Sequence, residues 1–542
     1  MPPINNDGSP SFIKIVTNET RFDPLDLTIA SISELNLKQN HSNFIHSAKT
    51  GWLSGAQFYQ IAQGQAKMLS STFDLTPGSR IALSGRGSVS FATTFLAAQI
   101  LRLVVVPINP NYTERELTYI LKDVRPAVFA CDAIDQPNLE FITKLRFDKD
   151  PYIGPGSHLP TTNSSISLIT YDEINRRGTD QSSLYEGESP YGKINVDGQT
   201  ALPCSGSPSD IALCAYTSGT TGNPKGALLS HSNLISSIQG LSVAWDWKSS
   251  DRLLLTLPLF HMHGLGVGLI GSMVVGSSIV LEEKFDLEAV FSAISAHRPS
   301  LFFGVPTIYG RLVGDSRSSN FSKFRLIVSG SAPLSPQTFA KIDQVMGQPP
   351  LERYGMTETV MNTSNPFDGA RKAGSVGKPL CGVSVGIDNR GEIWLKGPNI
   401  FQGYLGQEEA TAKSFANGWF ATGDVGRFDE DDYLIIDARL KDLIITGGFN
   451  VYPREVEDQL RALPQIAEVA VVGRQSEIWG EEVVAFIVWK SLPLKTSDLI
   501  DLLKAQLAPY KVPKDFISID ALPKNAMGKV LSKELRKMAQ DI

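Results

Sequence analysis

The sequence predicts an α/β protein with a large N-terminal domain, made of two α/β sheet subdomains and a small β module, and a smaller α+β C-terminal domain. Three observations predict this arrangement. The chain has 542 residues, which is too long for one compact core. Helical patterns alternate with short β-branched runs from about Leu27 to Val280, and a second run of this kind extends to about Gly386. The pattern then changes near residue 390 and again after Lys441.

The first run contains the clearest strands. RIALSGRG (80–87), VVVPINP (104–110) and AVFACD (127–132) are typical of buried strands, and FATTFLAAQIL (91–101) is typical of a helix between the first two. Alternation of strands and helices favours parallel sheets that are covered by helices. Residues 150–210 depart from this pattern because Ser, Thr, Gly and Pro dominate them, so we expect a surface excursion there.

A stretch without charge lies at residues 253–281, which contain no Asp, Glu, Lys or Arg. Its length would allow a membrane span. However, Pro258, His261, His263 and several Gly interrupt it. We therefore expect buried strand, loop and helix here, and no transmembrane segment.

The last third of the chain changes character twice. GEIWLKGPNIFQGYLG (391–406) and GWFATGDVGRFDEDDYLIIDARLKD (418–442) alternate apolar and polar residues between turn residues, which predicts a small β module. The predicted elements that follow are helix, strand, strand and helix, at residues 453–463, 468–474, 482–489 and 497–507. These form a compact α+β unit. We place the N-terminal domain at residues 1–440 and the C-terminal domain at residues 441–542.

The composition argues against several kinds of function. The net charge is −6, from 50 basic and 56 acidic residues, and no long basic run occurs, which argues against nucleic acid as a partner. The four Cys are scattered without a C-x-x-C pair, so neither a disulfide framework nor a zinc site is indicated. Residues 1–25 lack the patterns of a signal or transit peptide, and the final MAQDI is not a targeting tail. We expect a cytoplasmic protein, and the sequence leaves its oligomeric state open.

The stretch YTSGTTGNPKG (216–226) has the parts of a phosphate cradle. Gly lets backbone N–H groups turn inward, and the hydroxyls and a Lys add hydrogen-bond donors and positive charge. The Walker P-loop, G-x-x-x-x-G-K-[ST], does not fit. Asn223 and Pro224 precede Lys225, and Gly226 follows it where Ser or Thr should bind Mg²⁺. The stretch therefore indicates phosphate binding of a kind that differs from P-loop kinases and GTPases.

The stretch YGMTET (354–359) offers an aromatic face, a hydroxyl and a carboxylate within six residues. Tyr354 could stack on a base, Thr357 could bond a phosphate and Glu358 could hold Mg²⁺ beside it. Taken alone, an ordinary turn is the better explanation of this stretch.

Three more stretches carry chemical groups. WFATGD (419–424) places an acid in a tight Gly turn, where Asp424 could accept from both hydroxyls of a ribose, although Asp is common in turns. ARLKDLIITGGFNVYPREVE (438–457) pairs basic residues with a Gly-Gly loop at the expected domain border. PKNAMGK (523–529) places Lys529 on a Gly-containing loop, where a solvated Lys is the alternative.

Together these stretches resemble, in order and content, the acyl-adenylate-forming (AMP-binding) superfamily, which contains acyl-CoA synthetases, the adenylation domains of peptide synthetases and luciferases. The resemblance covers about Leu27 to Leu535. It implies that YTSGTTGNPKG grips the β- and γ-phosphates of ATP. It also implies that the protein uses ATP, Mg²⁺ and CoA together with a small-molecule carboxylic acid.

The resemblance implies roles for single residues. The phosphate loop would be lined by Thr217, Ser218, Gly219, Thr220, Thr221, Gly222 and Lys225. The adenine would lie between two groups of residues, which are Gly330, Ser331 and Ala332 on one side and Tyr354 and Gly355 on the other. The ribose would be held by Asp424, with Arg439 nearby. The catalytic residues would be Thr357 at the α-phosphate, Glu358 on Mg²⁺, and Lys529 between the acyl carboxylate and the α-phosphate.

In this superfamily the small domain rotates between the two half-reactions. The hinge here would be Lys441. The loop residues Gly447, Gly448 and Phe449 would then swing in to form the CoA tunnel. The C-terminal domain is therefore expected to be mobile and to carry the catalytic Lys529.

Three stretches look like malonyl-CoA synthetases specifically, namely residues 257–269, 301–313 and 352–380. A dicarboxylate needs a cation for its second carboxylate, and an Arg guanidinium offers a bidentate fork. Fatty-acid and coumarate ligases usually have Gly before the Tyr of YGMTE, whereas this chain has Arg353. Arg353 is therefore the first candidate for a carboxylate clamp and Arg371 is the second. A structural ion pair is the alternative for each.

Two more residues are candidates for the acyl pocket. His261 would lie where the pocket meets the CoA tunnel, and Met361 would line the pocket wall, with a satisfied buried imidazole and plain core filling as the alternatives. The leading hypothesis is an ATP-dependent malonate–CoA ligase, with methylmalonate as a further substrate. The alternatives are a ligase for another small, fatty or aromatic acid, and a relative that binds nucleotide without turnover.

Overall fold

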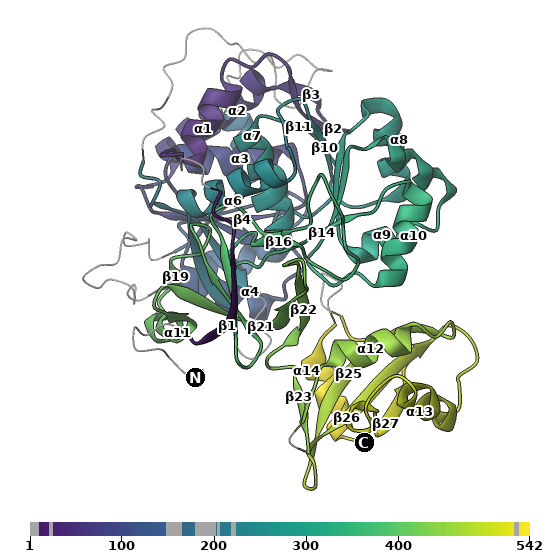
Figure 1. Ribbon diagram of the computed structural model, residues 1–542. Helices are drawn as coiled ribbons and strands as arrows, with labels where there is room; N and C mark the ends of the chain where they lie inside the picture. Colours follow the sequence, from purple (N-terminus) through teal and green to yellow (C-terminus); the bar gives the residue numbers. More distant parts are fainter. Residues whose placement is uncertain are drawn as a thin grey trace.

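The computed structural model describes residues 10–20, 25–147, 165–178, 202, 206–217, 224–447, 449–524 and 530–542, and the elements and contacts below belong to these residues. They form a large N-terminal domain of sheets and covering helices and a smaller α+β C-terminal domain, as predicted. In Figure 1 the small domain, in yellow-green, projects from one end of the large domain.

The first sheet of the large domain is mostly parallel. Its strand order is β19 (Gly403–Tyr404), β9 (Lys225–Ser230), β8 (Ile211–Thr217), β5 (Val104–Ile108), β4 (Arg80–Ser84), β6 (Val128–Cys131) and β7 (Ser167–Thr170). Only the pairings of β9 with β8 and of β19 with β9 are antiparallel among these strands. The helices of this part are α2 (Gly55–Thr72), α3 (Val89–Ile100), α4 (Glu114–Val124), η1 (Gln136–Lys144) and α5 (Tyr171–Gly178). Strands β4, β5 and β6 are buried along their whole length, which confirms the strands predicted there and the helix between the first two.

The second sheet is parallel in its centre. Its strand order is β16 (Lys378–Pro379), β15 (Thr363–Ser364), β14 (Leu351–Tyr354), β13 (Leu326–Ser329), β12 (Leu301–Gly304), β10 (Arg252–Leu255), β11 (Ser278–Leu281), β2 (Asn43–Ser47) and β3 (Gly51–Ser54). Its helices are α1 (Ile29–Leu37), α6 (His231–Ala244), the π-helix η3 (His263–Leu269), α7 (Ile270–Val275), α8 (Leu287–His297), α9 (Pro306–Leu312), η4 (Ser316–Lys323) and α10 (Pro336–Met346).

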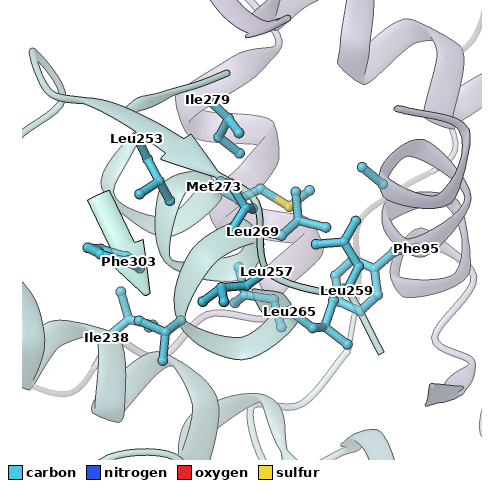
Figure 2. Close-up of a cluster of buried hydrophobic side chains, with 14 of the residues drawn as sticks. Phe95, Ile238, Leu253, Leu257, Leu259, Leu265, Leu269, Met273, Ile279 and Phe303 are labelled. Carbon is cyan, nitrogen blue, oxygen red and sulfur yellow. The ribbon is translucent and has the colours of Figure 1, made fainter. Parts of the chain in front are cut away.

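The uncharged stretch 253–281 forms part of this subdomain. It contains most of β10, a loop, η3, α7 and β11, which confirms the predicted strand, loop and helix. Figure 2 shows side chains from this stretch meeting Phe95 of α3, Ile238 of α6 and Phe303 of β12 in one apolar cluster. Within the residues that the structure describes, no helix has the length and apolar character that a membrane crossing requires.

The small β module forms a third sheet. Its strand order is β1 (Phe12–Thr17), β17 (Ser384–Asp388), β18 (Glu392–Lys396), β21 (Trp419–Phe428) and β20 (Phe415–Ala416), with β22 (Leu434–Arg439) paired to β21 and α11 (Glu408–Ser414) beside them. Two expectations for this module were wrong. Residues 403–404 leave it as β19 and join the first sheet. The stretch 419–424 is not a tight turn but part of a long strand, in which Gly423 has φ +67° and the register with β18 shifts.

The expected surface excursion at 150–210 is partly wrong as well. Residues 165–178, which lie inside it, form β7 and α5 as regular members of the first subdomain. Thr170 and Glu173 form reciprocal hydrogen bonds at the start of α5. A Cβ added to Gly64 of α2 would lie 2.1 Å from the carbonyl oxygen of Gly178, so the two helices meet closely at that point.

The C-terminal domain has its own sheet and core. The strand order is β24 (Phe449–Val451), β23 (Ile444–Thr446), β26 (Gly480–Trp489) and β25 (Ile466–Ser476), with β27 (Asp515–Ser518) paired to β26. The helices are α12 (Pro453–Arg461), α13 (Thr496–Lys504), η5 (Pro509–Lys511) and α14 (Ser532–Gln540). Two apolar clusters built from residues 444–539 fill the two faces of this sheet. The order helix, strand, strand, helix was predicted, whereas β23, β24, β27 and α14 were not. The boundary between residues 440 and 441 stays a prediction.

Candidate active site

A tyrosine and an arginine hold the carboxylate of Asp424. Tyr354 ends β14, and its hydroxyl donates to Oδ2 of Asp424 at 2.5 Å. Nε of Arg439 lies 2.6 Å from Oδ1, because residues 424 and 439 face each other across β21 and β22. Asp424 is only 3% exposed, and its charge raises the pKa of Arg439. The structure thus brings together three of the residues that the sequence assigns to the nucleotide.

A buried carboxylate lies next to this group. Glu358 is 7% exposed, and burial raises its pKa. Its Oε1 accepts a hydrogen bond from the hydroxyl of Tyr404 at 3.0 Å, and its carbonyl accepts from N of Phe401 at 2.8 Å. Within the described chain no Lys or Arg forms an ion pair with Glu358. The half-buried Thr357 precedes it.

Lys225 contacts the aromatic ring of Tyr404. Its Nζ is 4.8 Å from the centroid of the Tyr404 ring, which is within cation–π distance. Lys225 pairs with Thr217 at the end of the hairpin formed by β8 and β9. A Cβ on Gly226 would lie 2.7 Å from Sγ of Cys214, so this position needs Gly for the strands to approach.

Arg353 lies buried beside the predicted adenine loop. The side chain is 4% exposed, and burial lowers its pKa to about 9, so the guanidinium keeps its charge at neutral pH. Nη2 donates to Oγ of Ser331 at 3.4 Å, while Nε has no partner in the described part of the protein. A Cβ on Gly330 would lie 2.5 Å from the guanidinium carbon, so Gly330 leaves the space that Arg353 fills.

His263 also contacts Ser331. Nδ1 of His263 lies 3.4 Å from Oγ of Ser331, and its ring stacks on Phe303 with centroids 6.1 Å apart. Burial and the charge of Arg353 lower the pKa of His263 well below its ordinary value, so its imidazole is neutral. The sequence placed Ser331 against the adenine. The structure also places its hydroxyl between His263 and Arg353.

Strained backbone marks the edges of the site. Ser331 and Val360 have backbone φ angles of +71° and +55°. Residues other than Gly rarely adopt positive φ angles, and those that do cluster at functional sites. Gly355 lies against Val360, since a Cβ there would be 2.0 Å from the carbonyl oxygen of Val360. The same Cβ would be 2.9 Å from Cε of Met361, so the buried Met361 side chain packs over Gly355.

His261 and Arg371 have different surroundings. Burial lowers the pKa of His261 to about 4, so it is neutral at physiological pH, and the described residues offer its ring no hydrogen bond. The guanidinium of Arg371 donates to the carbonyl oxygens of Pro349, Pro366 and Phe367, at 2.6, 3.4 and 3.3 Å. These contacts tie loops together, and none of them is shared with Arg353. The role of Arg371 as the second candidate for a carboxylate clamp stays a prediction.

The remaining predicted residues lie at the predicted hinge, in the loop that follows it, next to Ser331, or outside the described residues. Lys441 follows β22, and its carbonyl oxygen accepts from Nη2 of Arg536 at 3.0 Å. Gly447 has φ +56°, and Phe449 is 57% exposed and stacks on Tyr510 at 4.7 Å. Ala332 is exposed next to Ser331. The residues that lie outside the described ones are Ser218, Gly219, Thr220, Thr221, Gly222, Gly448 and Lys529.

The sequence did not point to Tyr404 or to His263 as residues of the site. No local signal distinguishes Tyr404 in the stretch GYLG, because its contacts arise from the pairing of β19 with β9. The alternation of His261 and His263 in the sequence could have pointed to a second polar group in the pocket.

Comparisons with known proteins show which family the chain belongs to. Residues 35–405 match the family described as AMP-binding enzyme, and residues 455–529 match the AMP-binding enzyme C-terminal domain. The chain is 33% identical to indoleacetate–CoA ligase of Aromatoleum aromaticum, over 90% of this chain and 93% of that protein. It is 32% identical to malonate–CoA ligase of Arabidopsis thaliana, over 88% of this chain and 81% of that protein.

A solved structure shows the same fold. The crystal structure of ATP-bound MatB from Rhodopseudomonas palustris matches with a TM-score of 0.82 and 34% identity, and the match covers 94% of this chain and 99% of that one. The chain therefore belongs to the AMP-binding enzyme family and is an ATP-dependent acid–CoA ligase.

Proposed function

We propose that this ligase joins malonate to CoA, consumes ATP and releases AMP and pyrophosphate, with methylmalonate as a second candidate substrate. The observation that supports malonate is Arg353, whose guanidinium is 4% exposed and forms no ion pair within the described chain. Burying a charge without a counter-charge lowers the stability of the folded protein by several kcal/mol, because the charge loses its hydration. Such a group favours a pocket in which the ligand supplies the opposite charge.

The surroundings of Arg353 fit a second carboxylate. The nearest polar groups are the hydroxyl of Ser331 and the neutral ring of His263, so no protein anion competes for the guanidinium there. A free carboxylate of malonate could accept from both Arg353 and Ser331. A monocarboxylic acid would bring no charge to this end of the pocket. Sequence identity does not choose between such acids, since the indoleacetate and malonate ligases are 33% and 32% identical to this chain.

The nucleotide would lie along the other side of the site. Asp424 would accept from the ribose hydroxyls, with its carboxylate already oriented by Tyr354 and Arg439. Adenine would lie between residues 330–332 and residues 354–355, and Thr357 would contact the α-phosphate. The roles of residues 218–222 on the phosphates and of Lys529 at the reacting groups stay predictions.

Glu358 fits a Mg²⁺ ligand. One of its oxygens is held by Tyr404, and no cation within the described chain pairs with it. Mg²⁺ is commonly bound by one or two carboxylates together with substrate phosphates. Among the described residues, no group of three or more acidic, His or Cys side chains is placed so that it could hold a metal ion. When bound, Mg²⁺ neutralises phosphate charge and so weakens the repulsion between the two anions that must meet.

The proposed reaction has two steps. First, an oxygen of one malonate carboxylate attacks the α-phosphorus of ATP, a new P–O bond forms and pyrophosphate leaves. Lys529 would offset the crowded negative charge in this step. Second, the CoA sulfur attacks the carbonyl carbon of the acyl-adenylate, a C–S bond forms and AMP leaves. Between the steps the domain of residues 441–542 would turn about Lys441.

Replacing Arg353 with Met tests the substrate. The variant Arg353→Met removes the charge and keeps most of the volume. Because breaking a buried ion pair with a ligand costs about 3–5 kcal/mol, we expect KM for malonate to rise at least about a hundredfold while KM for ATP changes little. The measurement is pyrophosphate release with malonate, methylmalonate, succinate, oxalate, acetate, octanoate and coumarate.

The matched control is Arg371→Met. Since Arg371 holds backbone carbonyls, this change should lower stability and leave KM for malonate as in the wild type. Strong turnover of the wild type on a monocarboxylate, with malonate inert, would contradict the malonate proposal and leave the ligase chemistry standing.

A further inference from the structure

Tyr404 reaches the candidate metal site from another sheet. It lies in β19, where residues 403 and 404 pair with Leu228 and Ala227 of β9. Strand β9 begins at Lys225, near the end of the phosphate stretch 216–226. This short strand leaves the β module and joins the first sheet, and it thus brings the Tyr404 side chain to the place where Glu358 and Lys225 lie.

Tyr404 contacts both charged groups. Its hydroxyl donates to Oε1 of Glu358 at 3.0 Å, and its ring centroid is 4.8 Å from Nζ of Lys225. The ring also packs edge-on against Phe401, with centroids 4.8 Å apart. One side chain is therefore fixed between the candidate metal ligand and the candidate phosphate-binding amine.

The backbone around Tyr404 fixes its position. N of Tyr404 donates to Oγ1 of Thr411 at 2.9 Å. The preceding Gly403 has φ +143°, and a Cβ there would lie 2.8 Å from Cγ2 of Thr411. Only Gly allows this close approach, so the position of Tyr404 is specified by its own neighbours.

Two opposite charges thus contact the same side chain. Glu358 is buried and Lys225 is half-buried, and opposite charges in such surroundings attract each other strongly. Nevertheless, no ion pair joins them in the described part of the structure. A direct pair would occupy the carboxylate and the amine with each other and leave neither for a metal or a phosphate.

We propose that Tyr404 is a positioning residue of the metal–phosphate site. Its hydroxyl holds one oxygen of Glu358 so that the other oxygen is available to Mg²⁺, and its ring holds Lys225 as a cation for the phosphates of ATP. Hydrogen-bond partners of this kind orient carboxylate ligands of metals, and their loss typically weakens metal binding by about 10–100-fold. The proposal rests on the proposed role of Glu358, but it does not depend on which acid is the substrate.

The test is Mn²⁺ binding to the full-length protein with ATP and without any acid. Free Mn²⁺ is measured by electron paramagnetic resonance. For Tyr404→Phe we expect Mn²⁺ binding to weaken by about 10–100-fold, because the hydroxyl is gone. ATP binding without metal should change less than about twofold, since the ring stays beneath Lys225.

Two more variants separate the contacts of Tyr404. Tyr404→Leu removes the ring as well, and we expect it to weaken metal-free ATP binding several-fold in addition to Mn²⁺ binding. The control is Tyr433→Phe, because the Tyr433 hydroxyl donates to the carbonyl of Ala370 at 2.9 Å and its ring lies beneath Lys372 and Lys378 at 4.4 and 4.9 Å. This variant has the same kinds of contact elsewhere and should bind Mn²⁺ and ATP as the wild type does.

Wild-type Mn²⁺ affinity in Tyr404→Phe would overturn the proposal, and so would an equal loss in Tyr433→Phe. Thermal unfolding of each variant shows whether it folds. Unchanged Mn²⁺ binding in Glu358→Gln would remove Glu358 as the ligand, and the role of Tyr404 with it. Because no acid is present, failure of the malonate proposal leaves every one of these results unaffected.

Discussion

At the scale of single residues, the carboxylate of Asp424 is oriented before any nucleotide arrives. Tyr354 and Arg439 bind its two oxygens, at 2.5 and 2.6 Å. A group that is held in its working position loses little entropy when the ligand binds. The site can therefore hold a ribose without rearranging its own side chains.

Asp424→Asn tests this role. The change keeps the shape and removes the charge, and hydrogen bonds to charged groups contribute about 1.5–3 kcal/mol. We expect ATP affinity to fall by about 10–100-fold, as measured by isothermal titration calorimetry without acid. The control Asp437→Asn breaks a similar cross-strand pair with Arg427 on the same two strands, and it should leave ATP affinity unchanged. Equal affinities for both variants would contradict the assignment.

A buried histidine makes stability depend on pH. N of Ile29 donates to Nδ1 of His231 at 3.2 Å, and burial lowers the pKa of His231 to about 4 from the ordinary 6.5. As pH falls below 6.5 the unfolded chain binds a proton that the folded protein does not bind until pH 4. The contribution of neutral His231 to the free energy of unfolding is therefore fully present above pH 6.5 and is lost as pH falls through this window, by about 2 kcal/mol between pH 7.5 and pH 5.

His231→Asn should flatten this dependence, because its side-chain oxygen can accept from Ile29 without titrating. The measurement is urea unfolding of both proteins at pH 7.5 and pH 5. Other titrating groups are common to the two proteins, so the difference between their pH slopes reports on His231. Identical pH dependence of unfolding in the two proteins would show that the pKa of His231 is not lowered in the folded protein.

Single residues of the site were predictable to different degrees. Glu358, Asp424 and Arg353 were named from short motifs whose roles the family resemblance implies, and the structure shows that all three side chains are buried. The contacts of Tyr404 were not predictable, since they arise from a strand that crosses into another sheet. The contacts of the Ser331 hydroxyl with Arg353 and His263 were not predictable, because its φ of +71° and the packing around it are not visible in the sequence.

At the scale of elements, burial decided which strands could be predicted. Strands β4, β5 and β6 are buried on both faces and give unbroken apolar runs. β1 is an edge strand that alternates half-buried and exposed residues, so its sequence resembles an irregular segment. α5 is a short helix within a region dominated by Ser, Thr, Gly and Pro, and its last residue, Gly178, closely contacts α2.

The contact of α2 with α5 gives a stability prediction. Gly64→Ala would place a methyl group 2.1 Å from the carbonyl oxygen of Gly178, and overpacking of this kind costs about 1–3 kcal/mol. Gly310→Ala in α9 is the control, because nothing lies within 4 Å of a Cβ there and the change should stabilise that helix by about 0.5–1 kcal/mol. Urea unfolding at neutral pH compares the two. Equal midpoints would contradict the close approach of the helices.

At the scale of the whole molecule, the two domains meet across a cleft of about 790 Å³. Lys14 and Phe428 line it on the large domain, and Asp458 and Lys511 line it on the small one. Nη1 of Arg454 crosses to the carbonyl oxygen of Ile436 at 2.6 Å. Polar contacts of this kind allow relative motion of domains. The hinge at Lys441 stays a prediction.

The unpaired guanidinium of Arg353 has a consequence for the stability of the whole protein. While the pocket holds no acid, the fold carries the desolvation cost of that charge. If the proposed second carboxylate of malonate binds there, it relieves this cost, so malonate would act as a folding ligand and would raise the melting temperature with its concentration. Under the proposed function, selection for thermal stability alone would favour an apolar residue at this position, whereas selection for malonate would keep the arginine. Stability and specificity therefore oppose each other at one side chain.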